Sequence, residues 1–222
     1  MPSSQLNDDL TEKYAKNYEA HVPGKKNEEV VKYYNEWADT YDKDLDSSVY
    51  RGPQIAADVC NVFVIDKKSR IIDVGAGTGF CGYFLKKHGF ENVDALDPSQ
   101  SMLLVAKAKN VYRNLFNQAI CANRQTSIET STYDALVLSG AFGEGHIPTE
   151  GIREIARLVK SSGIIILVMR KEYLTDVKDY ENRLEPLMNQ MIDEKIWFNI
   201  TRFEVENYSF NKTGIVYVFR KN

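Results

Sequence analysis

The stretch IIDVGAGTGF, Ile71–Phe80, decides the fold because it joins an apolar run to three closely spaced glycines. Gly75, Gly77 and Gly79 alternate with small residues directly after that run. Glycine costs backbone entropy, so a cluster of this kind indicates a loop that a ligand approaches closely. A strand, a glycine loop and a following helix together form a site for a nucleotide-like ligand.

Strand-like and helix-like segments alternate from Arg70 onward. We expect strands at 70–74, 92–97, 114–120, 133–140 and 164–170, and helices at 80–89, 98–110, 149–163 and near 179–194. Two last strand-like runs, 196–206 and 214–222, flank a polar turn and predict an antiparallel hairpin. The fold class is therefore α/β: a Rossmann-like, mostly parallel sheet with helices on both faces and a terminal hairpin.

The chain before this alternation is expected to add a helical extension. Residues 1–27 form a polar segment, which Pro23 and Gly24 separate from a domain spanning 28–222, and we predict that the segment acts as a lid. A first helix is expected next, because Val30, Tyr34, Trp37 and Tyr41 recur at helical spacing and would lie on one face of it. A second helix starts at Pro53, and its inward face is expected to hold Ile55, Val59, Val62 and Phe63.

Composition limits the class of protein. The 222 residues carry a net charge of −3, which gives no general electrostatic case for nucleic acid or an anionic membrane. The longest apolar run is too short to span a bilayer, and the polar first ten residues do not predict a secretory signal. Cys60, Cys81 and Cys121 lack metal-site spacing, so we expect reduced thiols and no metal. These features favour a cytoplasmic protein and do not exclude the nucleus.

Asp97 ends the second expected strand, roughly 20 residues after the glycine loop, at the spacing of a ribose-binding carboxylate. The alternative is a plain tight turn with Asp97 as a helix-start residue. A nicotinamide dehydrogenase is disfavoured, because Phe80 stands where its motif needs a third glycine. A phosphate-binding P-loop is disfavoured too, since no Lys-Ser or Lys-Thr pair follows.

The segments DVGAGTG (73–79) and ALDPSQSML (95–103) together resemble the class I S-adenosylmethionine-dependent methyltransferases. The resemblance covers about residues 28–222 and implies that the last strand inserts antiparallel into the sheet. Within that family, four shorter motifs resemble the methyltransferase-like protein of the Williams–Beuren syndrome chromosomal region and its relatives. They are YYNEWADTYDKDL (33–45), YRGP (50–53), LSGAFGEGHIP (138–148) and MR (169–170).

The resemblance implies S-adenosylmethionine as the cofactor. The backbone of Gly75, Ala76 and Gly77 would approach its methionine portion, with Asp73 shaping the loop, and Asp97 would bind the ribose hydroxyls. Beyond these loop residues, a second group would complete the cofactor site. Trp37 and Tyr41 would close over the methionine end, Tyr50 or Arg51 would bind its carboxylate, and Ser139 and Gly140 would leave room for the methyl group. On helical spacing alone, Trp37 and Tyr41 only anchor their helix.

The adenine would lie between Pro98 and Met102, although Met102 can equally be plain helix core. Many family members carry an aspartate after the third strand to bind the adenine amino group. Ile120 stands there in this chain, so backbone groups near Ile120 and Cys121, with Asn123, would take over.

Candidate catalytic residues follow the fourth and fifth strands. Glu144 and His146 are candidate general bases, and His146 is expected to titrate near neutral pH. Arg170 would bind an acidic group of the substrate or pair with a nearby carboxylate. The segment 138–145 lacks the Pro-Pro motif of DNA and glutamine methyltransferases, so we predict a small-molecule acceptor and no nucleic acid. The alternative is a non-catalytic, cofactor-binding interaction module. The sequence leaves the acceptor and the oligomeric state open.

Overall fold

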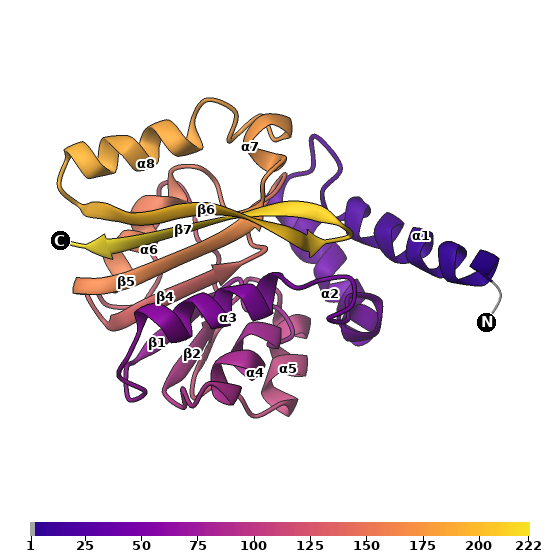
Figure 1. Cartoon of the computed structure of the whole chain (residues 1–222), viewed down its shortest axis with the longest axis horizontal. Helices are drawn as coiled ribbons and strands as arrows, with labels where there is room; N and C mark the ends of the chain where they lie inside the picture. The colour runs from indigo at the N-terminus through magenta and orange to yellow at the C-terminus, as the bar shows by residue number, and fades with distance from the viewer. Residues whose placement is uncertain (1–2) are drawn as a thin grey trace.

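The computed structural model describes residues 3–222, with side chains from residue 8 onward, so the start of the predicted segment 1–27 lies outside the described residues. Within 3–222, seven strands form one sheet in the order β3-β2-β1-β4-β5-β7-β6 (Figure 1). The strands are β1 (Ile71–Val74), β2 (Val93–Leu96), β3 (Leu115–Phe116), β4 (Tyr133–Ser139), β5 (Val159–Arg170), β6 (Trp197–Ser209) and β7 (Lys212–Lys221). The helices are α1 (Ser3–Glu19), α2 (Asn27–Asp44), α3 (Gly52–Phe63), α4 (Phe80–Lys87), α5 (Gln100–Ala108), α6 (Gly151–Leu158), α7 (Tyr173–Asp176) and α8 (Leu184–Asp193).

The strand directions confirm the predicted fold class. β1 to β5 pair in parallel, whereas β7 runs antiparallel between β5 and β6. The turn between β6 and β7 places Phe210 and Asn211 at φ of 48° and 58°. Two successive positive φ values define the two-residue hairpin turn whose twist matches the flanking strands. The terminal hairpin and the antiparallel insertion are therefore both confirmed.

Helices cover both faces of the sheet (Figure 1). On one face, α6 and α8 pack Ile155 and Met188 into a cluster with Leu136 of β4. On the other face, α3 and α4 pack Ala57 and Leu85 against the opposite side of the same strands. α1 and α2 instead lie beyond the carboxyl ends of the parallel strands, the edge where open α/β sheets bind ligands (Figure 1).

One predicted boundary, at the start of β5, and one residue expected to face inward on α3 are wrong. The helix expected at 149–163 ends at Leu158, because Val159 already pairs with Tyr133 as the first residue of β5. Val62 is 69% exposed rather than inward. The buried stripe of α3 runs instead along its small side chains, which pack closely on the sheet; they are Pro53, Ala56, Ala57 and Cys60.

Two other predicted elements are shorter than expected. The strand expected at 114–120 is only Leu115–Phe116, because the Asn117 side chain turns back to donate to the carbonyls of Asp97 and Pro98. The helix expected near 179–194 is α8, which begins only at Leu184.

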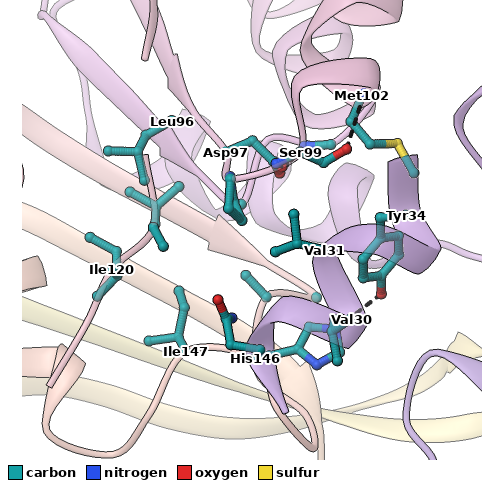
Figure 2. A pocket seen from close by; sticks show the side chains of 18 of the residues that line it. Val30, Val31, Tyr34, Leu96, Asp97, Ser99, Met102, Ile120, His146 and Ile147 are labelled. Atoms are coloured by element: carbon teal, nitrogen blue, oxygen red, sulfur yellow. Dashed lines mark hydrogen bonds between the residues drawn. The ribbon is translucent and has the colours of Figure 1, made fainter. Parts of the chain in front are cut away.

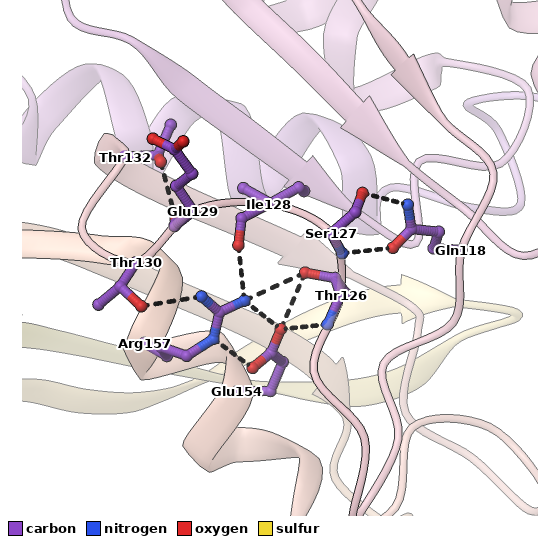
Figure 3. Close-up of polar contacts among 9 residues, drawn as sticks. All are labelled: Gln118, Thr126, Ser127, Ile128, Glu129, Thr130, Thr132, Glu154 and Arg157. Carbon is purple, nitrogen blue, oxygen red and sulfur yellow. Dashed lines mark hydrogen bonds and ion pairs between the residues drawn. The ribbon is translucent and has the colours of Figure 1, made fainter.

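The irregular segment between β3 and β4 is tied to α6 by hydrogen bonds to Glu154 and Arg157, which form an ion pair within that helix (Figure 3). Glu154 Oε1 accepts from the backbone N–H and the hydroxyl of Thr126, both at 2.8 Å. Arg157 donates to Glu154 Oε2 at 2.6 Å and to the Ile128 carbonyl at 2.8 Å. These hydrogen bonds from α6 fix the path of the segment that carries Ile120.

Candidate functional site

The glycine loop between β1 and α4 is held against the end of β2. The backbone N–H groups of Gly75 and Ala76 donate to the Leu96 carbonyl at 2.8 and 3.2 Å. Gly75 and Gly77 have φ of 70° and 53°, which favour glycine. A Cβ on Gly75 would lie 2.3 Å from the Cβ of Ala141, whereas one on Gly77 would meet nothing within 4 Å. The loop therefore leaves open space beside Gly77.

Asp97 directly follows β2 and borders that space. Its Oδ2 accepts from the Gly77 N–H and its Oδ1 from the Ser99 N–H, both at 2.8 Å. Burial raises the pKa of Asp97 to about 6, against the opposing effect of these two donors. A carboxylate can accept about four hydrogen bonds, so acceptor positions remain for a ligand that carries hydroxyl groups.

A pocket with about 730 Å³ of empty space lies between the glycine loop, the ends of β1, β2 and β4, and helix α2. Asp97 and Ser99 form a polar side of it, and Ile120 and Ile147 line an apolar side (Figure 2). The predicted site residues in its wall are Tyr41, Tyr50, Gly75, Gly77, Asp97, Pro98, Met102, Ile120, Ser139, Gly140 and His146.

The remaining predicted site residues do not line this pocket; they are Trp37, Arg51, Asp73, Ala76, Cys121, Glu144 and Arg170. Trp37 is buried and donates its indole N–H to Asp44 of the same helix at 2.7 Å, and it does not line the pocket. Asp73 lies beneath the loop and accepts from the Tyr112 hydroxyl at 2.6 Å. Burial raises the pKa of Asp73 to about 7.

Three of these residues lie at other places around the site. Arg51 is exposed on the surface. Glu144 accepts from the Gly24 N–H at 3.0 Å and so ties its loop to the segment before α2. Arg170, at the end of β5, lines a smaller hollow next to the pocket.

His146 is neutral in this structure, and the expectation that it titrates near neutral pH is wrong. Burial lowers its pKa to about 4. Its Nδ1 lies 2.7 Å from the Glu144 carbonyl and its Nε2 lies 3.0 Å from the Tyr34 hydroxyl. A carbonyl only accepts, so Nδ1 carries the proton and Nε2 accepts from Tyr34. The ring therefore links α2 to the loop after β4 (Figure 2).

Tyr34 is the main residue of the pocket that sequence reasoning missed as a site residue. The spacing of Val30, Tyr34 and Tyr41 predicts a buried helix face, and that face is confirmed. Periodicity cannot show whether such a face covers core or a ligand pocket. The same helix is held over the pocket through Asn35, whose Oδ1 accepts from the Ser99 hydroxyl at 2.8 Å.

Comparisons with known proteins agree with this geometry. Residues 72–167 match the methyltransferase domain family. The crystal structure of a TehB-like S-adenosylmethionine-dependent methyltransferase from Corynebacterium glutamicum has the same fold. Its TM-score is 0.56 at 18% identity, over 86% of this chain and 97% of that one. Residues 72–167 therefore carry a methyltransferase domain, and the cofactor of such a domain is S-adenosylmethionine.

Among curated proteins, the chain is similar to human methyltransferase-like protein 27, at 27% identity over 178 residues. That match covers 78% of this chain and 70% of the human protein. The chain is also 35% identical over 100 residues to 2-methyl-6-phytyl-1,4-hydroquinone methyltransferase 1 of rice, which covers 45% of this chain and 30% of the rice protein. The resemblance inferred from the sequence motifs is thereby confirmed.

The residues of the pocket fit this cofactor. The open space beside Gly77 admits a ligand against bare backbone, and Asp97 retains acceptor positions for a ribose diol. The apolar side around Ile120 suits an adenine ring.

Among the described residues, no helix has the length and apolarity to cross a bilayer.

Proposed function

We propose that the chain transfers a methyl group to a small-molecule acceptor. The proposal rests on one observation, the narrow hollow next to the cofactor pocket. That hollow is lined by residues of α1, α2, β5 and the β6–β7 hairpin. A hollow enclosed by these elements suits a small molecule rather than a folded protein or a nucleic-acid duplex.

Individual residues would hold the cofactor as the motifs predict. Gly75 and Gly77 would offer bare backbone to its methionine portion, and the Asp97 carboxylate would accept from the ribose hydroxyls. Met102 and Ile120 would pack on the adenine. Ser139 and Gly140 occupy the end of β4, where both hollows meet. The prediction that Cys121, Arg51 or Trp37 contacts the cofactor receives no support from the pocket geometry.

When bound, S-adenosylmethionine supplies a methyl group that its sulfonium already activates. The chain's own groups would then orient the acceptor and exclude water. Burial raises the pKa of Tyr34, Tyr41 and Tyr50 above the usual range, so these hydroxyls stay protonated at neutral pH. His146 Nε2 already accepts from Tyr34. The described wall therefore favours an acceptor whose nucleophile needs no strong base.

Calorimetry and a transfer assay test this function. We expect the chain to bind S-adenosylmethionine and its demethylated product with roughly micromolar affinity, as is typical of metabolite sites, and not to bind NAD. Labelled methyl transfer into a small-molecule extract should exceed transfer into the protein or nucleic-acid fraction. Cofactor binding without transfer into any fraction would instead support a non-catalytic binding module. The cytoplasmic location stays a prediction.

A further inference from the structure

The smaller hollow next to the cofactor pocket has a wall of unusual composition. It shares Tyr34, Tyr41, Tyr50 and Gly140 with the larger pocket, so the two spaces meet at the end of β4. Gly140 lets the Tyr50 hydroxyl reach this junction, because a Cβ on residue 140 would lie 2.1 Å from that oxygen. An acceptor held in the smaller hollow would therefore approach the methyl group beside the Tyr50 hydroxyl.

Arg170 lies in the wall of this hollow and is only 6% exposed. Its Nη1 donates to Glu172 at 3.2 Å, and its Nη2 donates to Asn17 at 3.0 Å and to Ser209 at 2.7 Å. Its Nε is buried and has no hydrogen-bond partner among the described residues. A buried donor of a cation without a partner is costly, so this position favours an acceptor atom supplied by a ligand.

The charges around Arg170 leave this wall positive. Glu172 is shared, because Lys212 also donates to it at 2.9 Å, so one carboxylate faces two cations. His21 adds no charge, since burial and the nearby His146 lower its pKa well below the usual value. The tyrosine hydroxyls of the wall are neutral as well, as burial raises the pKa of Tyr173.

We propose that this hollow is the acceptor site and that its ligand is a small organic acid. The carboxylate of the acid accepts from Arg170 Nε, and its apolar or unsaturated body packs against the rings of Tyr173 and Tyr208. The inference rests on the proposed methyl transfer. An electron pair of the acid's nucleophilic atom forms the bond to the methyl carbon, the C–S pair stays on sulfur, and any proton on the nucleophile leaves to water.

Calorimetry on the chain saturated with S-adenosylhomocysteine tests this site with two probes of equal shape. Benzoate carries the charge, and benzamide is its neutral counterpart. We expect benzoate to bind at least tenfold more tightly than benzamide. The variant Arg170→Lys keeps the positive charge but lacks Nε, and it should weaken benzoate binding at least tenfold while S-adenosylhomocysteine affinity changes less than twofold. Arg202→Lys, at an exposed arginine of β6 that pairs with Glu185, is the matched control and should change neither.

Equal or undetectable binding of the two probes, or unchanged benzoate binding by Arg170→Lys, would overturn the acceptor site. A second measurement needs no variant, in case Arg170→Lys does not fold. Extract fractionated on an anion exchanger should give labelled methyl transfer in the retained, acidic fraction, and transfer confined to the neutral flow-through would also overturn the inference. Failure of S-adenosylhomocysteine to bind would contradict the proposed function itself, so the two failures are distinguishable.

Discussion

At the scale of single residues, Asp97 should make cofactor binding depend on pH. Its pKa lies at about 6 because the carboxyl group is buried. The ionised form offers its remaining acceptor positions to the ribose hydroxyls, whereas protonation removes one of them. We expect the Kd for S-adenosylhomocysteine to be flat above that pKa and to rise by up to about tenfold for each pH unit below it. Calorimetry between pH 5 and pH 8 measures this.

The variant Asp97→Asn serves as the control for that profile. It should bind about 10- to 100-fold more weakly at pH 7.5, as expected for hydrogen bonds to a charged group, and its affinity should not change between pH 5 and pH 8. A wild-type profile that is flat over the same range would remove Asp97 from the ribose site.

The two glycines of the loop should fail in different ways when replaced by alanine. Gly75→Ala places a Cβ against Ala141 and strains a positive φ, so it should lower the free energy of unfolding by roughly 2–5 kcal/mol. Gly77→Ala meets only the open space, so it should cost about 1–2 kcal/mol of stability from backbone strain and weaken cofactor binding at least tenfold. Urea denaturation and calorimetry on both variants separate these effects, and equal affinity losses would contradict the assignment.

At the scale of elements, the ion pair between Glu154 and Arg157 should control the segment that leads to Ile120. Glu154→Gln removes a charged acceptor and should destabilise the fold by about 1.5–3 kcal/mol at pH 7. Burial alone would raise the pKa of Glu154, but the donors from Arg157 and Thr126 outweigh it and lower the pKa. A lowered pKa in the folded state stabilises the fold at pH values above the unfolded pKa of about 4.3. This stabilisation is lost as the pH falls through the pKa of the folded state.

Urea denaturation from pH 7 down to pH 3 measures this contribution. The stability gap between wild type and Glu154→Gln should narrow toward the acid end. Glu129→Gln is the matched control, because Glu129 is exposed on the same segment, and it should show almost no effect at any pH. A gap that stays constant with pH would mean that the charge of Glu154 is not what holds the segment.

Element types could be predicted from the sequence where local pattern and tertiary packing agree. The apolar run of β5 and the polar turn of the hairpin predicted a buried strand and two antiparallel strands, which the structure confirms. The helix predicted over 159–163 and the strand predicted over 117–120 were wrong. Pairing with β4 makes the first segment a strand, and the side-chain hydrogen bonds of Asn117 end the strand before the second. Neither interaction has a local sequence signal.

At the scale of the whole molecule, α2 and the loop after β4 form a joint wall around the cofactor pocket. A ligand that contacts both should suppress local opening there. We expect S-adenosylhomocysteine to slow amide hydrogen exchange in 30–41 and 140–147, and to leave the β6–β7 hairpin unchanged. Mass spectrometry of peptic fragments measures this. Protection confined to 75–79 would mean that α2 does not cover the bound ligand.

The candidate site was predictable only in part, because some of its residues are placed by contacts between distant segments of the chain. Motif spacing identified the residues that follow a strand directly, such as Gly77 and Asp97, which line the pocket. It could not place Tyr34 in the wall or make His146 neutral, because both depend on how α2 docks on a distant loop. The hydroxyl of Tyr34 joins segments that lie more than a hundred residues apart in the chain.

The position of β7 between β5 and β6 has a consequence for how the chain matures. β6 leaves the ribosome before β7, yet among the strands of residues 3–222 it pairs only with β7. Until residues 212–221 have emerged, both β6 and the outer side of β5 are bare edges, open to pairing with another nascent copy. These bare edges therefore favour aggregation of the nascent chain until β7 has paired with both strands.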